Sequence, residues 1–334
     1  MGRSKGIYSI GIMLAVVLTI LFYRKGDQSP RQVPIIGITQ MIEHSSIDQE
    51  RHAFIQELNR QGYQDGKSIQ IIYRNAQGNM ADSTQIAQQL VTHQPNVIVA
   101  FSTPSAQTAQ PICKDHLIPL VFSTVTDPLK SKLISRLEPP RPELVAGVSD
   151  GISIEAHLKL IRDFLPKAKK VGVIYNNGEM NSSLMVSEFQ EKSGTYGLEV
   201  IVSSVSKSSD IVPALQSLIS KKIDAIYIPN DNLVVAAVPS LAPVCLEHKI
   251  PLFSGDLGSV EMGALSAAGY DRPELGQKTA QLVIRILKGE AVNTLPIETN
   301  HKIIIAVNDR TLKGLGLTLL DKLKSTVRMI EPTS

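Results

Sequence analysis

The chain contains no tryptophan, and aromatic residues make up only 4% of its 334 residues. Proteins that bind single-stranded nucleic acid use aromatic side chains as stacking platforms. The formal net charge is +3, but Arg3, Lys5, Arg24 and Lys25 all flank one N-terminal segment. Without these four, 30 basic residues face 31 acidic ones, so the rest of the chain offers no excess of positive charge to a phosphate backbone. We expect no nucleic-acid partner.

Several enzyme signatures are also missing. No Gly-x-Gly-x-x-Gly follows a strand pattern, and neither Gly-x-x-x-x-Gly-Lys-Ser/Thr nor His-Glu-x-x-His occurs. No helix-turn-helix pattern precedes the first α/β segment, which argues against a repressor. We therefore expect a binding protein with no cofactor and no catalytic residues. An enzyme of doubly wound fold remains an alternative, which turnover of a bound ligand would favour.

One strand–loop–helix–strand unit occurs twice. The first copy begins with the apolar run 97–101, and a helical stretch leads to Cys113-x-x-His116. The second begins with 225–229 and leads to Cys245-x-x-His248. In both copies an Ile-Pro-Leu sequence opens the next apolar run. Because strands and helices alternate throughout, the fold class is α/β, with two Rossmann-like lobes built on parallel sheets.

The two cysteines, Cys113 and Cys245, are the only ones in the chain. A structural zinc needs four ligands, whereas each Cys-x-x-His copy supplies two and the copies belong to different lobes. A disulfide would have to bridge equivalent helix ends of the two lobes. We expect no metal and no disulfide. Each cysteine is expected to be a small buried residue, and each histidine to lie at a helix C-terminus.

The N-terminal segment 1–26 has the pattern of a signal peptide or a membrane anchor. Residues 6–23 are nearly all apolar and follow a basic start. A run of about 18 residues is at the lower limit for a helix that spans a bilayer. No cysteine follows the run, which excludes a lipid-modified N-terminus. We expect an extracytoplasmic protein, with 6–23 as the anchor if it is retained and 27–33 as a tether.

Polar side chains follow the predicted strands of both lobes. In parallel sheets the carboxyl ends of the strands form the crevice in which ligands bind. Hydroxyls, amides and carboxylates at such ends suit an amino-acid zwitterion. Ser102, Asp127 and Asp231 could instead be helix caps, and His44 a residue at the pocket rim. The candidate ligand-binding residues are Gln40, His44, Ser102, Thr103, Thr126, Asp127, Asn176, Glu179, Asn181, Ser182, Asp231, Asn232 and Asp256.

Several motifs in order resemble one family over about residues 34–320. In lobe 1 and the segment after it they are Gly37-Ile-Thr-Gln-x-x-Glu-His44, Asn75-Ala-Gln-Gly78, Ser102-Thr-Pro-x-Ala-Gln107, Val125-Thr-Asp-Pro128 and Gly147-Val-Ser-Asp150. In lobe 2 they are Ile174-Tyr-Asn-x-x-Glu-x-Asn-Ser182 and Pro229-x-Asp-Asn232. Together they resemble substrate-binding proteins of ABC importers, in the tryptophan/tyrosine-binding group. The lipid-anchoring cysteine of many relatives is missing here.

The resemblance implies a type I periplasmic-binding-protein fold with a three-strand hinge. Lobe 1 would comprise 34–148 plus about 270–297, and lobe 2 would comprise 149–269 plus about 298–334. It also implies that Thr103 and its neighbours hold a ligand carboxylate and that Asp127 or Asp231 holds the ammonium. Asn176, Glu179 and Asn181 would complete the wall of lobe 2.

We therefore expect a solute-binding protein that captures a small amino-acid-like ligand, with an aromatic side chain suggested by the resemblance. Hinge closure would hold the ligand and present both lobes to an ABC permease in the membrane. We expect a monomer. The alternative is a membrane-tethered extracytoplasmic sensor module, which neighbouring genes for a signalling protein would favour.

Overall fold

The structure is a computed structural model that describes residues 33–299, 302–319 and 321–330. The predicted N-terminal segment 1–26 and all but residue 33 of the tether lie outside the described residues. The chain divides into Met1–Pro34 and one compact unit, Ile35–Ser334, and everything below concerns the second. No helix within the described ranges is both long and apolar enough to cross a bilayer.

The first sheet of the described chain has the strand order β11–β5–β4–β3–β1–β2, and all its pairs are parallel. Strands β3, β4 and β5 are buried along their whole length, as expected of a parallel sheet covered on both faces. The bounds are β1 (Ile35–Gln40), β2 (Gln70–Asn75), β3 (Val97–Phe101), β4 (Leu120–Val125), β5 (Val145–Ser149) and β11 (Ile297–Glu298).

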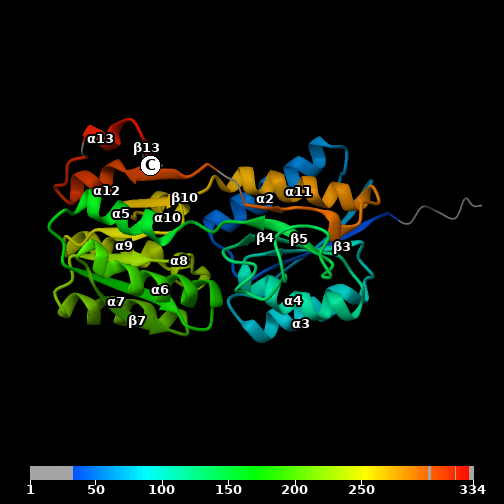
Figure 1. Cartoon of the computed structure of the whole chain (residues 1–334), viewed down its shortest axis with the longest axis horizontal. Helices are drawn as coiled ribbons and strands as arrows, with labels where there is room; N and C mark the ends of the chain where they lie inside the picture. Colours follow the sequence, from blue (N-terminus) through cyan, green and yellow to red (C-terminus); the bar gives the residue numbers. More distant parts are fainter. Residues whose placement is uncertain (1–32, 300–301, 320, 331–334) are drawn as a thin grey trace, which may run out of the picture. The chain divides into compact units, whose positions relative to one another are not determined.

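Helices cover both faces of this sheet. Figure 1 shows α2 (Ser45–Arg60) and α11 (Arg272–Leu287) on one face, with α3 (Met80–Thr92) and α4 (Thr103–Asp115) on the other. Each pair packs on its own apolar cluster. Helices α2 and α11 approach closely at Gly276, where a Cβ would lie 2.2 Å from the carbonyl oxygen of Glu50. We call this sheet and its four helices lobe 1.

The second sheet has the order β13–β12–β10–β9–β8–β6–β7. Only the β10–β12 pair is antiparallel among the described strands. The bounds are β6 (Lys170–Asn176), β7 (Glu199–Val205), β8 (Ala225–Ile228), β9 (Leu252–Ser254), β10 (Ser266–Gly269), β12 (Ile304–Asn308) and β13 (Val327–Ile330).

Helices also cover both faces of the second sheet, through two separate apolar clusters. We call this sheet and its helices lobe 2. The α-helices are α5 (Ile154–Phe164), α6 (Met180–Ser193), α7 (Ile211–Ser220), α8 (Asn232–Ala236), α9 (Val238–Glu247), α10 (Gly258–Glu261), α12 (Asp309–Gly314) and α13 (Asp321–Lys324). Among the described residues, lobe 2 also has two single turns of 3-10 helix, η1 (Gly194–Tyr196) and η2 (Ser208–Asp210), and lobe 1 has one, η3 (Val292–Thr294).

The predicted fold class, two α/β lobes on largely parallel sheets, is confirmed. The chain passes between the lobes after β5, after β10 and after β11, and the third connection includes residues 300 and 301, which are outside the described residues. The stretch 317–329, which has weak helical character in the sequence, is not one helix: it contains α13 and strand β13, which pairs with β12. Cys113 and Cys245 are both buried and unpaired, near the ends of α4 and α9.

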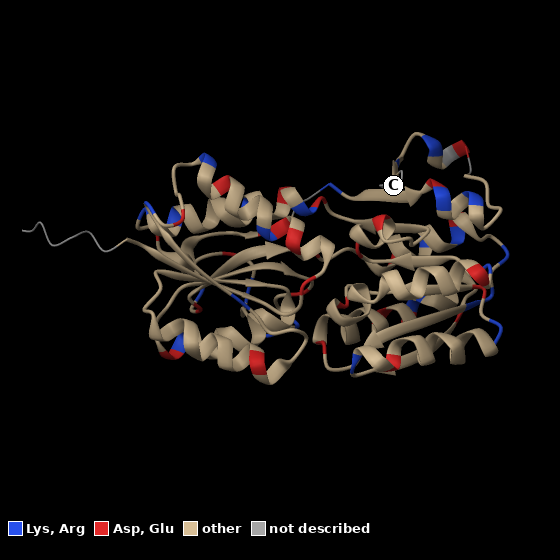
Figure 2. Ribbon diagram, turned by 180° about the vertical axis from the view of Figure 1, so that it is seen from behind, with Lys and Arg blue, Asp and Glu red and all other residues tan. Residues whose placement is uncertain are grey.

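Charged residues lie mainly on helices and loops, and the strands carry few of them (Figure 2). This distribution matches the burial of the strands, because an ionised side chain is stable in an apolar interior only when it is paired. The charged residues that are buried therefore mark special positions. Several of them lie where the two lobes meet, and they are described next.

Candidate functional site

The carboxyl ends of strands from both lobes line one small cavity. It encloses about 30 Å³ of space for water-sized molecules. Sites for drug-sized ligands are typically about 300 to 1,000 Å³. The cavity is therefore smaller than a typical ligand site. The lining residues are His44, Ile47, Ser102, Thr103, Thr124, Thr126, Asp150, Asn181, Asn230, Asp231, Asn232, Val235, Asp256 and Arg272.

The strand order places the lining groups of lobe 1 in a row. Neighbouring strands are β5, β4, β3 and β1, in that order. Asp150 directly follows β5, Thr124 and Thr126 lie at the end of β4, Ser102 follows β3, and His44 lies between β1 and α2. Because these strands are parallel, all of these residues belong to the same edge of the sheet, the edge where ligands bind in open α/β folds.

Six of the residues that line this cavity carry a buried polar side-chain atom without a hydrogen-bond partner. Such atoms are rare in folded proteins, and each calls for an explanation. Hydroxyl and guanidinium groups are donors, and amide oxygens are acceptors, so the set suits a ligand that carries both kinds of group. The atoms are His44 Nδ1, Ser102 Oγ, Thr124 Oγ1, Asn181 Oδ1, Asn230 Oδ1 and Arg272 Nε.

The backbone at two of these positions is strained. Ser102 has φ of 82° and Thr124 has φ of 53°, in the left-handed region that favours glycine. Each such residue costs about 1 to 3 kcal/mol unless the surrounding structure enforces it, and such residues cluster at functional sites. Ser102 also immediately precedes α4, whose N-terminus carries partial positive charge. Two free hydroxyls and a helix N-terminus thus form one wall of the cavity.

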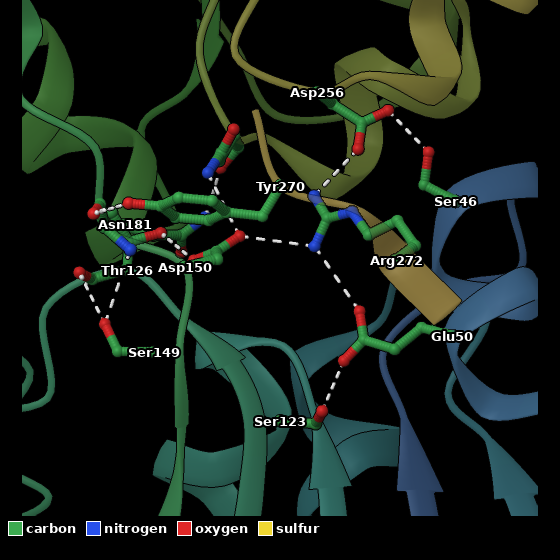
Figure 3. A network of polar contacts seen from close by, with 12 residues as sticks. Ser46, Glu50, Ser123, Thr126, Ser149, Asp150, Asn181, Asp256, Tyr270 and Arg272 are labelled. Carbon is green, nitrogen blue, oxygen red and sulfur yellow. Dashed lines mark hydrogen bonds and ion pairs between the residues drawn. The ribbon is translucent and has the colours of Figure 1, made fainter. Parts of the chain in front are cut away.

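Arg272, the first residue of α11, joins three buried carboxylates (Figure 3). Its Nη2 lies 2.8 Å from Asp256 Oδ1, and its Nη1 lies 3.3 Å from Asp150 Oδ2 and 3.4 Å from Glu50 Oε2. The three carboxylates come from the loop after β9 in lobe 2, the segment after β5, and α2 in lobe 1. The Arg272 guanidinium therefore joins a residue of lobe 1, a residue of lobe 2 and a residue of the connection after β5. Arg272 itself lies at the end of the connection after β10.

Burial and the neighbouring charges shift the pKa values of Asp256, Glu50 and Arg272. Burial alone would raise the pKa of Asp256, but the Arg272 guanidinium holds it below the usual value. At Glu50, burial dominates and raises the pKa to about 7 despite the attraction of Arg272. Burial disfavours the charged form of Arg272, yet the three carboxylates outweigh it and raise its pKa. Arg272 is therefore always cationic here.

Two further hydrogen bonds hold the lobes and their connections together. Ser46 Oγ, on α2 in lobe 1, donates to Asp256 Oδ2 at 2.6 Å. Tyr270 Oη, after β10, donates to the carbonyl oxygen of Gly151 at 2.9 Å, and so joins the first connection to the second. Of these two bonds, the first joins the lobes directly and the second joins two of the connections between them.

Asp231 and Glu179 organise the wall of lobe 2. Asp231 Oδ2 accepts from Ser182 Oγ and from the Asn176 backbone N–H, both at 2.5 Å, and Oδ1 accepts from the Val234 N–H at 2.9 Å. Glu179 accepts from the Asn232 side chain at 2.5 Å and from its backbone N–H at 3.1 Å. Burial, together with the neighbouring Asp231, raises the pKa of Glu179 to about 7. Both carboxyl groups already have several donors.

The structure brings eight of the thirteen predicted site residues to the cavity: His44, Ser102, Thr103, Thr126, Asn181, Asp231, Asn232 and Asp256. Five others do not line it: Gln40, Asp127, Asn176, Glu179 and Ser182. Asn176, Glu179 and Ser182 bond to residues of the lobe 2 wall, whereas Gln40 bonds to Asp48 and Arg51. Asp127 accepts from the backbone N–H groups of Leu129 and Lys130, as a turn residue does.

Six lining residues were not predicted: Ile47, Thr124, Asp150, Asn230, Val235 and Arg272. Asp150 follows a buried strand, which is the same signal that selected Ser102, but the apolar run before it is short. Asn230 precedes a selected Asp-Asn pair directly. Arg272 carries no local signal, because it reads as an ordinary residue at the start of a helix. Its contacts with Glu50 and Asp150 span 222 and 122 residues.

Residues 147–151 spell Gly-Val-Ser-Asp-Gly, which matches the Gly-x-Ser-x-Gly pattern of hydrolases. That pattern is meaningful where the serine lies on a tight strand-to-helix turn. Here Ser149 ends β5 and α5 begins only at Ile154. The Ser149 hydroxyl donates to the Thr126 carbonyl and accepts from the Gly151 N–H. The segment serves as a connection between lobes.

Comparison with known proteins identifies the family. A family model described as "ABC transporter substrate binding protein" matches residues 35–329. The chain belongs to this family. Its members are binding proteins, which agrees with the polar lining of the cavity. A tyrosine-binding protein of Clostridioides difficile is 40% identical over 285 residues, which cover 85% of this chain and 81% of the relative.

Solved structures agree. A conserved domain protein from Vibrio cholerae has a TM-score of 0.85 and 32% identity, covering 89% of this chain and 99% of that one. A Streptococcus pneumoniae ABC domain in complex with L-Trp has a TM-score of 0.83 and 26% identity, with the same coverage. A ligand-free, open substrate-binding protein from Clostridium difficile has a TM-score of 0.66 and 36% identity, covering 90% and 100%.

Proposed function

We propose that this substrate-binding protein captures an α-amino acid with an aromatic side chain and delivers it to the permease of an ABC importer. It acts outside the cytoplasm as a monomer, with the N-terminal segment as signal or anchor. The observation that carries the proposal is the set of six unpaired polar atoms around one cavity between the lobes. Donors and acceptors are both present, which a zwitterion requires.

The two ends of the zwitterion have different partners. The carboxylate binds the hydroxyls of Ser102 and Thr124 at the N-terminus of α4, where the helix dipole favours an anion. The ammonium binds Asp150, whose carboxylate faces the cavity, together with the side-chain oxygens of Asn230 and Asn181. Asp127 does not line the cavity. Asp150 and Asp231 each already accept three hydrogen bonds, but those of Asp150 are 3.1 to 3.3 Å long, whereas those of Asp231 are 2.5 to 2.9 Å long. Asp150, with the weaker existing contacts, is therefore the better ammonium partner.

Two observations support an aromatic ligand. One relative is a tyrosine-binding protein, and a solved structure of another contains L-Trp. Within the cavity, Ile47 of lobe 1 and Val235 of lobe 2 supply apolar contact surface. Aliphatic side chains on two sides can pack against the faces of a ring, so the absence of tryptophan does not argue against an aromatic ligand.

Hinge closure is supported by the cavity and by the structural comparisons. The cavity is too small for an amino acid, so entry needs separation of the lobes. The open, ligand-free relative is 36% identical in sequence but has a TM-score of only 0.66. The L-Trp complex is 26% identical but has a TM-score of 0.83, so it is more similar in structure. This pattern is expected if the present structure is closed. A ligand that contacts both lobes favours that state by its differential affinity.

The test is titration calorimetry of the purified protein with the twenty amino acids. We expect L-tyrosine or L-tryptophan to bind with micromolar or lower Kd. Tyramine and tryptamine lack the carboxylate, and the corresponding arylpropionic acids lack the ammonium. We expect each of these analogues to bind at least about a hundredfold more weakly, because each leaves buried polar groups unpaired. An absence of binding by every amino acid would contradict the proposal.

A matched pair of variants tests the ammonium site. Asp150→Asn removes the proposed charge partner, and we expect it to weaken binding by at least about a hundredfold. Asp127→Asn changes a carboxylate outside the cavity in the same way, and we expect it to leave Kd within about twofold. Equal effects of the two substitutions would mean that Asp150 is not the ammonium partner.

A further inference from the structure

We propose that His44 accepts a hydrogen bond from a donor on the ligand's aromatic ring, and so distinguishes tyrosine or tryptophan from phenylalanine. This inference rests on the proposed function and adds the chemistry that selects among aromatic ligands. The donor is the phenol O–H of tyrosine or the indole N–H of tryptophan. Three observations carry the inference: the position of His44, its tautomer and its unpaired nitrogen.

His44 lies at the opposite end of the cavity row from the proposed zwitterion site. Along the first sheet, Asp150 follows β5, Thr124 lies on β4, Ser102 follows β3, and His44 follows β1. Neighbouring strands are about 4.8 Å apart, so the ends of β4 and β1 are separated by about 10 Å. An aromatic amino acid has about this length. A ligand with its backbone groups at β5, β4 and β3 therefore extends its ring towards β1 and past Ile47, which also lines the cavity.

The neighbours of His44 determine its charge and tautomer. Burial lowers the pKa of His44, against the opposing effect of the Asp256 carboxylate, so the ring is neutral at pH 7. The Asn232 side chain lies beside the ring and raises its pKa, which is the effect of an acceptor next to the imidazole. The amide nitrogen of Asn232 is already bonded to Glu179 at 2.5 Å, which leaves its oxygen for the imidazole. An amide oxygen can only accept, so the imidazole nitrogen bonded to it carries the proton.

Nδ1 is buried and has no hydrogen-bond partner, and we assign Nε2 to the contact with Asn232. In a neutral imidazole with a proton on Nε2, Nδ1 is an acceptor. Nδ1 is buried and belongs to a residue that lines the cavity. The group that satisfies it must therefore be a donor. Phenol O–H and indole N–H are donors, whereas the phenylalanine ring has none.

The expected consequence is selectivity rather than general affinity. A site that hydrogen-bonds a substrate group rejects an analogue without that group, because the buried partner is left unpaired. We expect tyrosine to bind at least about tenfold more tightly than phenylalanine, and tryptophan to bind at least about tenfold more tightly than 1-methyltryptophan. These ratios depend on His44 and not on the groups that hold the zwitterion.

The experiment measures Kd for these four ligands by calorimetry with the full-length protein. His44→Leu removes the acceptor, and we expect it to bring each ratio within about twofold of unity, through weaker binding of tyrosine or tryptophan and unchanged binding of phenylalanine. His44→Gln retains an acceptor oxygen and should keep part of the discrimination. The matched control is His52→Leu, at an exposed position of α2, the helix that begins directly after His44, and it should leave both ratios unchanged.

The inference is overturned if the wild-type protein binds both members of each pair equally, or if His44→Leu keeps the wild-type ratios. Both outcomes leave the proposed function intact, because amino acids still bind. If none of the amino acids binds the wild-type protein, the proposed function fails and this inference fails with it. Thermal unfolding of each variant verifies that it is folded.

Discussion

Replacement of Arg272 by methionine should destabilise the protein severely. Its guanidinium lies 2.8, 3.3 and 3.4 Å from three carboxylates, and the side chains of Glu50, Asp150 and Asp256 are 0%, 5% and 1% exposed. Removal of one partner from a buried ion cluster leaves uncompensated charge in a medium of low dielectric constant. The measured cost in such cases is about 3 to 5 kcal/mol. The pKa of Glu50 is already about 7, so Glu50 can take up a proton when the cation is lost, and we expect a value within this range.

Urea unfolding followed by circular dichroism measures this cost from the shift in midpoint and the slope. The matched control is Arg285→Met on the same helix α11. Arg285 pairs with Glu290 at 2.5 Å, but its side chain is 42% exposed, so we expect a loss below about 1 kcal/mol. Arg272→Met combined with Asp256→Asn should recover part of the loss. Equal, small losses for both single variants would refute the view that Arg272 holds the cluster together.

Three further predictions concern packing, closure and pH. Gly147→Ala places a Cβ 2.4 Å from a buried ring on β4 and should cost at least about 1 kcal/mol in denaturant unfolding, whereas Gly194→Ala meets no atom within 4 Å and should cost nothing. Ser46→Ala removes the 2.6 Å hydrogen bond to Asp256 between the lobes. We expect the variant without ligand to have a larger radius of gyration than the wild type in solution scattering. An unchanged radius would contradict a role of this hydrogen bond in closure. Burial lowers the pKa of His157 from 6.5 to about 4. As the pH falls, the unfolded chain therefore binds the proton before the folded protein does. The free energy of unfolding should decrease between about pH 6.5 and pH 4, by about 3 kcal/mol at most. His157→Phe should flatten this part of the curve, and an unaltered pH dependence would contradict the assignment.

The lobes and most strands could be predicted from the sequence because their signals are local. The apolar run 97–101 coincides with β3, and the run 225–229 contains β8. Buried parallel strands are short apolar runs separated by polar loops, so the apolar runs and the polar residues that bound them suffice to locate the strands. The end of the chain was less predictable, since β13 pairs with β12 in parallel across a connection that contains α12 and α13, and the residues of β13 are partly buried or exposed.

The candidate site was predictable only where polar residues directly follow strands. Ser102, Thr103 and Thr126 were found in this way, and they line the cavity. The same rule also selected Asp127, which instead caps a turn, because sequence does not show which of two adjacent polar side chains faces inwards. Arg272 could not be found, since the carboxylates that make it important are distant in the chain and come together only in the fold.

A crystal structure of the protein grown with L-tyrosine or L-tryptophan tests the central claim most directly. The account predicts ligand density between the lobes, with the carboxylate at Ser102 and Thr124, the ammonium at Asp150 and the ring donor at His44. It also predicts a cavity enlarged from the present volume of about 30 Å³. Ligand density elsewhere on the molecule, or a reversed zwitterion with its carboxylate at Asp150, would contradict the account.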